Sequence, residues 1–169
     1  MRPLSCRQEY TSKDTCVSVV NKVYKKYPFN SHSLILDYGG GKYDKNAEYM
    51  LKKNASKVYV YDKYNRSQDH NDAVLDYMGM NKPDYVVCSN VLNVIKEDSV
   101  IDEILRFIST EYREAVVLIV IYERNKTGIP EVTSRGYQRN ERKEKYYPLI
   151  KKYFTVLNTK DDIIECRSK

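Results

Sequence analysis

The chain has 169 residues, with 29 lysines and arginines against 23 aspartates and glutamates, and so carries a formal net charge of +6. A chain of this length has room for one domain that buries roughly two-thirds of its unfolded surface, and its positive charge favours contact with polyanions. No apolar run approaches the ~20 residues of a membrane span, and the N-terminus lacks a signal-peptide core. Four scattered cysteines and two histidines argue against a disulfide framework or a metal site. We therefore expect a cytoplasmic protein without a membrane segment or a metal.

Hydrophobic periodicity predicts helices that alternate with strands from the N-terminus onward. The first helix is expected at 11–27, with valines and tyrosines on one face and lysines opposite, and the first strand at 33–37. Asp44 is a suitable N-cap for a helix that runs to Lys53, and the second strand is expected at 57–61.

The segment between Asp62 and Asp84 is ambiguous. Its apolar residues fit a helix at 67–79 or a strand at 73–76, but the segment hardly has room for both. We favour the helix, which leaves a sheet trimmed by one strand.

The second half of the chain continues the alternation and ends in a hairpin. Its expected elements are a strand at 84–88, a helix at 99–109, a strand at 115–121, a helix at 147–152, and hairpin strands at 153–157 and 162–166. The seven apolar residues at 115–121 do not alternate with polar ones, which is typical of a central strand covered on both faces. We therefore expect an α/β fold over 1–169, with a mostly parallel sheet, a C-terminal antiparallel hairpin and an N-terminal helical extension at 1–30.

A glycine-rich turn follows the first predicted strand. Leu34–Asp37 leads through Tyr38 into three consecutive glycines, Gly39 to Gly41, which allow the backbone to approach a ligand closely. Asp62 closes the second strand 21 residues later, where nucleoside-binding α/β folds keep the carboxylate that binds a ribose diol. The order strand, glycine turn, helix, strand and acid predicts a nucleoside-cofactor site.

A dinucleotide is a poor fit for this site. The G-x-G-x-x-G fingerprint needs a third glycine for close helix–sheet packing, and the corresponding position counted from Gly39 is Asp44. An acid at a helix start would also repel a pyrophosphate, which favours the positive end of the helix dipole. A cofactor without phosphate therefore fits better.

The glycine turn and the following acid resemble the S-adenosylmethionine site of class I methyltransferases. This resemblance implies a Rossmann-like fold, with the glycine turn under the methionine part of the cofactor and Asp62 on the ribose hydroxyls. The cofactor-binding residues that it implies are Asp37, Tyr38, Gly39, Gly41, Asp62, Lys63, Asn65 and Asn90.

The turn at 89–95 follows the 84–88 strand and, in many class I methyltransferases, the equivalent turn flanks the transferable methyl group. DNA amino-methyltransferases carry Asn/Asp-Pro-Pro-aromatic there, whereas this chain has Asn90-Val91-Leu92-Asn93, and it also lacks the Pro-Cys pair of cytosine carbon-5 enzymes. Asn90 is equally suited to capping the following turn. The candidates for orienting or deprotonating an acceptor are Asn90, Tyr122 and Glu123.

Residues 123–140 lack periodicity and predict a long loop at the ligand edge of the sheet. Its candidate substrate-binding residues are Arg124, Arg135 and Arg139 for phosphates, with Tyr137, Gln138 and Asn140 for stacking on bases and reading base edges. These residues predict contact with nucleic acid. The alternative is a basic surface loop without a ligand.

Together with Tyr61–Ser67 and Gly136–Asn140, these motifs are similar to a set of small methyltransferase-like proteins of bacteriophages and phage-defence loci, over roughly 33–166. The similarity implies an S-adenosylmethionine-dependent methyltransferase that acts on nucleic acid, in a phage-infected bacterial host. Methyl transfer is an in-line displacement that depends on alignment more than on a signature nucleophile. Two alternatives stay open, a cofactor-binding protein without transferase activity and a small-molecule methyltransferase.

Overall fold

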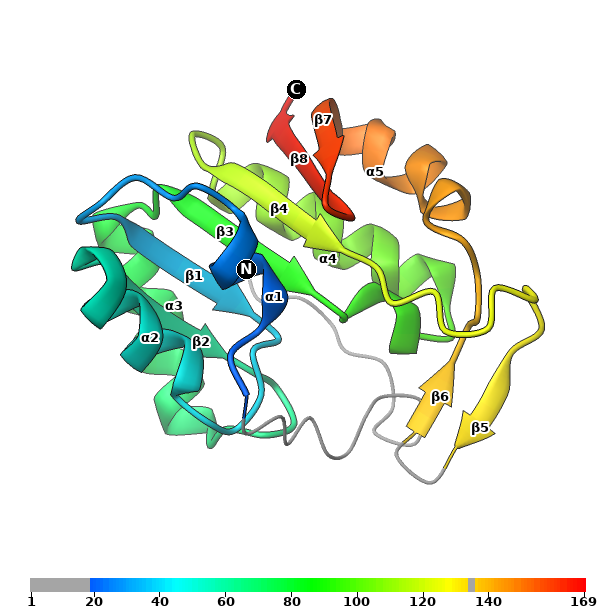
Figure 1. Cartoon of the computed structure of the whole chain (residues 1–169), viewed down its shortest axis with the longest axis horizontal. Coiled ribbons are helices and arrows are strands. Elements are labelled where there is room, and N and C mark those ends of the chain that lie inside the picture. The colour runs from blue at the N-terminus through cyan, green and yellow to red at the C-terminus, as the bar shows by residue number, and fades with distance from the viewer. Residues whose placement is uncertain (1–18, 134–135) are drawn as a thin grey trace.

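The computed structural model describes residues 19–133 and 136–169 and centres on one six-stranded sheet (Figure 1). The strands lie in the order β2-β1-β3-β4-β8-β7, with bounds β1 (Leu34–Tyr38), β2 (Lys57–Tyr61), β3 (Tyr85–Ser89), β4 (Val116–Val120), β7 (Phe154–Lys160) and β8 (Ile163–Ser168). The first four are parallel, β8 is antiparallel to β4, and β7 is antiparallel to β8. The predicted parallel sheet with a C-terminal antiparallel hairpin is therefore confirmed.

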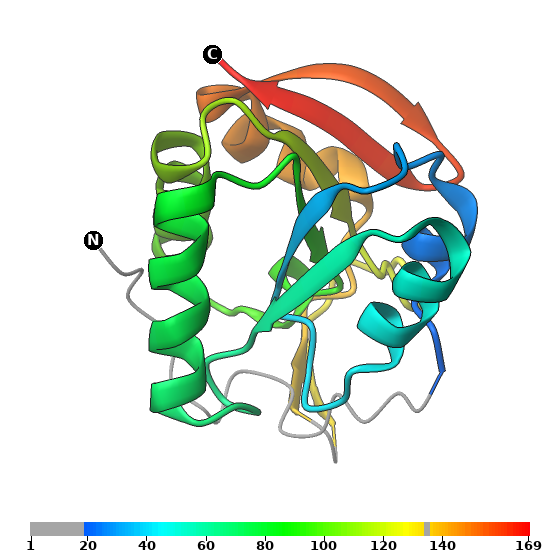
Figure 2. The same ribbon diagram turned by 90° about the vertical axis from the view of Figure 1, so that its left-hand side faces the viewer.

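Helices cover both faces of this sheet. They are α1 (Lys22–Lys26), α2 (Lys45–Asn54), α3 (Gln68–Asn81), α4 (Asp98–Glu111) and α5 (Tyr147–Tyr153). Figure 2 shows α1 and α2 on one side of the strands and α3 and α4 on the other. This arrangement is a three-layer α/β sandwich.

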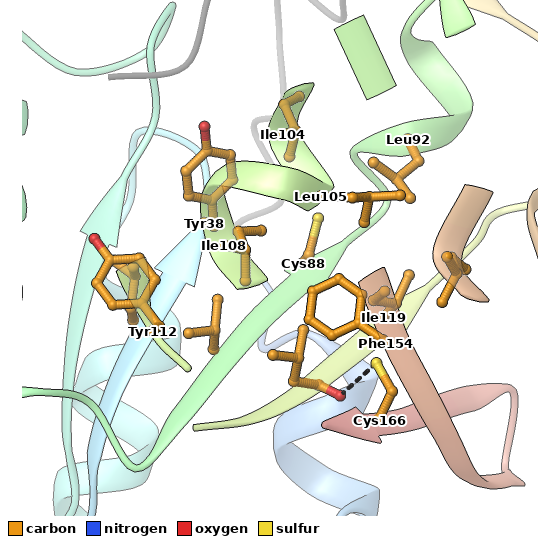
Figure 3. Close-up of a cluster of buried hydrophobic side chains, with 14 of the residues drawn as sticks. Tyr38, Cys88, Leu92, Ile104, Leu105, Ile108, Tyr112, Ile119, Phe154 and Cys166 are labelled. Carbon is orange, nitrogen blue, oxygen red and sulfur yellow. Dashed lines mark hydrogen bonds between the residues drawn. The ribbon is translucent and has the colours of Figure 1, made fainter. Parts of the chain in front are cut away.

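Two hydrophobic cores result, because successive strand residues point to opposite faces. Ile35 and Leu118 pack with the core under α1 and α2, whereas Leu36 and Ile119 pack with the larger core under α3, α4 and α5. All four side chains are fully buried. Figure 3 shows part of the larger core, where the Cys166 thiol donates to a strand carbonyl. Burial on both faces explains why the predicted central strand is apolar without alternation.

The chain between β2 and β3 forms the single helix α3, as favoured above, and no strand. Ser67 caps this helix, since its hydroxyl accepts the His70 N–H at 3.2 Å. The sheet is therefore trimmed at the β2 edge.

The expected helix at 11–27 is shorter in the described part of the chain. Residues 11–18 lie outside the described residues, and the helix begins only at Lys22, because the Asn21 side chain accepts the Val23 N–H as an N-cap. Asp44 does precede α2, but its carboxylate makes no capping hydrogen bond and instead accepts from Arg66 at 2.8 Å.

The segment at 123–140 is not a structureless loop. It contains a two-stranded hairpin, β5 (Glu131–Thr133) and β6 (Gly136–Gln138), which Figure 1 shows projecting beyond the carboxyl ends of the parallel strands. Two short 3-10 helices, η2 (Leu92–Val94) and η3 (Lys143–Tyr146), precede α4 and α5. Sequence periodicity does not detect such short strands.

Truncation of Ile119 to alanine should lower the free energy of unfolding by about 2–5 kcal/mol, because it removes a fully buried side chain from the central strand. The matched control is Ile129→Ala, since Ile129 is 66% exposed and should change stability by about 0.5 kcal/mol or less. Urea unfolding followed by circular dichroism measures both variants. Equal stability losses would contradict the described packing of β4.

Candidate active site

The candidate site lies where the strand order reverses. β1 has β2 on one side and β3 on the other, and open α/β sheets bind ligands at the carboxyl ends of strands at such a point. A cavity of about 650 Å³ opens there. The residues that matter among those lining it are Val20, Asn21, Asp37, Gly39, Gly40, Tyr43, Asn46, Ser89, Asn90, Asn93, Tyr122 and Gln138. Its size suits a ligand such as a nucleoside cofactor.

Asp37, the last but one residue of β1, forms the floor of the cavity. It is 3% exposed, and its Oδ2 accepts from the Asn46 amide at 3.2 Å. Burial raises the pKa of the Asp37 carboxyl from 3.8 to about 6, although the nearby Tyr24 hydroxyl and the hydrogen bond from Asn46 oppose the rise. No described lysine or arginine forms an ion pair with this carboxylate. A cationic ligand group would therefore compensate a buried charge that has no ion pair within 19–133 and 136–169.

The glycine turn packs directly against this carboxylate. A Cβ atom at Gly40 would lie 2.6 Å from Asp37 Cγ, and one at Gly39 would lie 2.4 Å from a methyl carbon of Val91. Gly39 also has φ +85°, a conformation that disfavours side chains. Its N–H donates to the Tyr61 carbonyl at 2.7 Å, which ties the turn to β2. Both glycines are thus required by the chain itself, before any ligand binds.

Asp62 lies at the end of β2 but does not line the cavity. Its Oδ2 accepts the Gly41 N–H at 2.8 Å, while its Oδ1 accepts the backbone N–H groups of Tyr64 and Asn65 and the Asn65 side-chain amide. The carboxylate thus joins the glycine turn to the turn after β2. Each carboxylate oxygen has two lone pairs, and within 19–133 and 136–169 Oδ2 accepts one hydrogen bond, so a second acceptor position suits a hydroxyl.

Four other residues expected at the cofactor lie outside the cavity lining, namely Tyr38, Gly41, Lys63 and Asn65. Tyr38 is 4% exposed and stacks on Tyr61 at 4.8 Å within the larger core, as Figure 3 shows for its side chain among the core residues. Lys63 is exposed, and the Asn65 side-chain amide donates a hydrogen bond to Asp62. These side chains therefore lie around the cavity and do not form its wall.

Asn90 and Tyr122 follow the neighbouring strands β3 and β4. The Asn90 N–H donates to the Val120 carbonyl at 2.9 Å, and both side chains line the cavity. Asn90 has φ 59°, a strained conformation of the kind that gathers at functional sites. Glu123 is not part of the lining, and its carboxylate accepts the Lys143 N–H at 2.7 Å. Of the three catalytic candidates, the structure brings two to the cavity.

Several polar side chains of the 123–140 segment form ion pairs or hydrogen bonds within the protein. Arg124 pairs with Glu131 at 2.7 Å, and Arg139, whose side chain is 11% exposed, pairs with Asp98 at 2.6 Å. Asn140 is fully buried and donates to a backbone carbonyl of the same segment. These three side chains hold the hairpin in place.

Gln138 is the member of this segment that reaches the cavity. It lines the cavity and accepts from the buried Asn93 amide at 3.2 Å. Tyr137 is half-buried on β6, and Arg135 lies outside the described residues.

Sequence reasoning missed Asn21, Asn46 and Ser89. The Asn21 N–H donates to Asn46 Oδ1 at 2.8 Å, and the Asn21 amide donates to Ser89 Oγ at 3.0 Å. These contacts join α1, α2 and β3 around the cavity. Asn46 lies one turn before the buried Met50, so a polar residue at a core position of a helix was the available signal.

Among the described residues, no three histidine, cysteine, aspartate or glutamate side chains cluster in a way that would hold a metal ion. None of the helices within 19–133 and 136–169 is long and apolar enough to cross a membrane.

Comparison with solved structures finds proteins of the same fold, several of which are methyltransferases. The 1,6-didemethyltoxoflavin-N1-methyltransferase of Burkholderia thailandensis, with 1,6-didemethyltoxoflavin and S-adenosylhomocysteine bound, matches with a TM-score of 0.60 and 13% identity over 82% of this chain and 72% of that chain. The mitomycin 7-O-methyltransferase MmcR matches with a TM-score of 0.61 and 18% identity over 87% and 52%. The PH0226 protein of Pyrococcus horikoshii OT3 matches with a TM-score of 0.56 and 13% identity over 87% and 86%.

At these identities the likeness shows the fold, which is the Rossmann-like fold of class I methyltransferases. The chain spans about half the length of several O-methyltransferases that it matches. No protein-family model matches the chain, and no curated protein matches its sequence.

Gly40→Ala should destabilise the protein by about 1–3 kcal/mol, because the new Cβ meets the buried Asp37 carboxylate. Gly79→Ala is the matched control, since a Cβ there meets nothing within 4 Å on α3 and should stabilise the helix by about 0.5–1 kcal/mol. Chemical denaturation of the two variants gives the comparison. A Gly40→Ala protein as stable as the wild type would show that the turn does not pack on Asp37.

Asp37→Asn should make stability less dependent on pH. Because the folded protein raises the pKa of Asp37 from 3.8 to about 6, the folded state binds the proton more tightly, and this contribution to stability is lost as pH rises from about 4 to about 6. At low pH this contribution to the free energy of unfolding is about 3 kcal/mol. The Asp37→Asn variant should therefore gain stability relative to wild type across this window, and the exposed Asp76→Asn should not. A constant difference between pH 4 and 7 would contradict burial of the charge.

Proposed function

We propose that the chain is an S-adenosylmethionine-dependent methyltransferase. The observation that carries this proposal is the cavity at the strand-order switch point, with a glycine turn packed on a buried Asp37 carboxylate that has no ion-pair partner among the described residues. S-adenosylmethionine carries an ammonium and a sulfonium, and either charge would compensate this carboxylate. Neighbours of the same fold were crystallised with S-adenosylmethionine or S-adenosylhomocysteine, which adds support.

Asp37 and the backbone of Gly39 and Gly40 would hold the amino-acid part of the cofactor. Asp62 lies outside the cavity lining but beside Gly41, and the second lone pair of its Oδ2 would accept from a ribose hydroxyl. When bound, the cofactor supplies an activated methyl group on sulfur. The acceptor would then approach from the side of Asn90 and Tyr122, whose side chains can orient it in line with that group.

Nucleic acid is the acceptor that we propose first, on the strength of the net charge of +6 and of Tyr137 and Gln138 close to the cavity. It would also fit the resemblance to methyltransferase-like proteins of bacteriophages and phage-defence loci, which act in the cytoplasm of a phage-infected bacterial host. A small molecule is the second candidate, because Arg124 and Arg139 already pair with acidic side chains and are less available for phosphates.

The protein should bind S-adenosylmethionine and S-adenosylhomocysteine and not NAD, which isothermal titration measures directly. Asn90→Ala should bind the cofactor normally yet lose about 10- to 100-fold in methyl transfer, because the acceptor is no longer oriented. Asn158→Ala, on the exposed outer strand β7, is the matched control.

Tritiated methyl incorporation into DNA, RNA and cell-extract metabolites would identify the acceptor class. Binding of NAD in preference to both sulfur cofactors would overturn the proposal. Cofactor binding without transfer to any of these acceptors would point to a non-catalytic binder.

A further inference from the structure

Helix α1 lies outside the alternation of strands and helices, yet it forms part of the cavity wall. Val20, Asn21 and Val23 line the cavity, and Tyr24 is fully buried against the face of the sheet that carries Asp37. Five residues are too few for a stable isolated helix, so its position depends on these contacts.

The contact with α2 fixes the orientation of one amide. The Asn21 N–H can only donate, and it lies 2.8 Å from the Asn46 side chain, so that side chain must present its oxygen to Asn21. The amide nitrogen of Asn46 then faces Asp37 Oδ2 at 3.2 Å and donates to it. Because Asn46 is 8% exposed and Asp37 3% exposed, water competes little with this chain of hydrogen bonds.

A second contact holds α1 in place. The Asn21 side chain donates to Ser89 Oγ at 3.0 Å, at the end of β3, and its Oδ1 accepts the Val23 N–H at 3.1 Å. Asn21 is therefore both the cap of α1 and its link to the strand ends.

We propose that the segment Asn21–Lys26 belongs to the cofactor site. The Asn21 N–H orients the Asn46 amide, and this amide donates to Asp37 and keeps its carboxylate ionised for a cationic group of the ligand. Asn21 and Asn46 are positioning residues, because they act through Asp37. This inference rests on the function proposed above for its ligand, an ammonium- or sulfonium-bearing cofactor. Any event that displaces α1 would consequently weaken cofactor binding.

Several other groups face Asp37 and act on its charge. Tyr24 from α1 and Arg66 from the turn after β2 favour the ionised carboxylate, whereas Asp62 at the end of β2 disfavours it. The Cys88 thiol on β3 is buried nearby, and the proximity of Asp37 contributes to raising the pKa of that thiol. Arg66, Asp62 and Cys88 lie outside α1 and α2, so their effect on Asp37 is common to all of the variants, whereas the effect of Tyr24 depends on the position of α1 and is compared between the two Asn21 variants.

A pair of substitutions at Asn21 isolates the backbone donor. Asn21 has φ −64° and ψ 138°, which proline adopts without strain, so Asn21→Pro removes the N–H while keeping the backbone path. Asn21→Ala is the matched control, because it also loses the side-chain cap and the link to Ser89 but retains the N–H. Asn46→Ala removes the donor to Asp37 directly.

The first measurement is the carboxyl titration of Asp37 by carbon-13 NMR in the protein without added ligand. The midpoint should rise by about one pH unit in Asn46→Ala and in Asn21→Pro, and should stay near the wild-type value in Asn21→Ala. Equal midpoints in Asn46→Ala and wild type would overturn the inference. So would equal midpoints in Asn21→Pro and Asn21→Ala, and if Asn21→Pro does not fold, Asn46→Ala decides alone.

The second measurement is the affinity for S-adenosylhomocysteine between pH 6 and 8.5. A one-unit rise in the midpoint leaves about one-fifth of the wild-type ionised fraction at pH 6, so Asn46→Ala should bind about fivefold more weakly there and nearly normally at pH 8.5. A loss that is the same at both pH values would contradict the inference. If S-adenosylhomocysteine does not bind the wild type at all, the proposed function fails, while the NMR titration still tests the role of Asn46.

Discussion

The burial of the Asp37 carboxylate beneath the glycine turn is the constraint around which the site is built. Gly40 has no room for a Cβ because that carboxylate lies there, and the turn is held in this position by the Tyr61 carbonyl of the neighbouring strand. The carboxylate in turn receives its hydrogen bond from Asn46 on α2. One buried charge thus ties together β1, β2 and α2, and its cost to stability indicates that it serves a ligand more than the fold.

The parallel strands decide which other residues can join Asp37. Because β1, β3 and β4 run in the same direction, the residues that follow them meet at one edge of the sheet. Asn90 and Tyr122 are 32 positions apart in the chain and line the same cavity for this reason. Asn93 then reaches across to Gln138 and attaches the β5–β6 hairpin to the same edge.

The hairpin region shows why net charge is a weak guide to a binding surface. Arg124 and Arg139 read as free cations in the sequence, but each finds an acidic partner within 3 Å, and Arg139 is largely buried. The partner of Arg139, Asp98, is 41 residues away in the chain, so sequence alone does not reveal the pairing. The net charge is unchanged by these ion pairs, but the two arginines are less available to an acceptor.

The order of strands and helices, the trimmed sheet and the glycine turn could all be predicted from the sequence, because each rests on local patterns of apolar residues and glycines. The roles of Asn21, Asn46 and Asp62 could not be predicted in this way. Asn21 and Asn46 are 25 residues apart, and their contact exists only because α1 and α2 pack on the same face of the sheet. Asp62 was expected at a ribose, and its hydrogen bond from the Gly41 N–H is a further contact that the sequence did not reveal. The sequence by itself determined where the candidate site lies, because strand ends and glycines mark its position. Only the tertiary structure decided which polar groups share hydrogen bonds there, because that depends on the distances between elements that are separate in the chain.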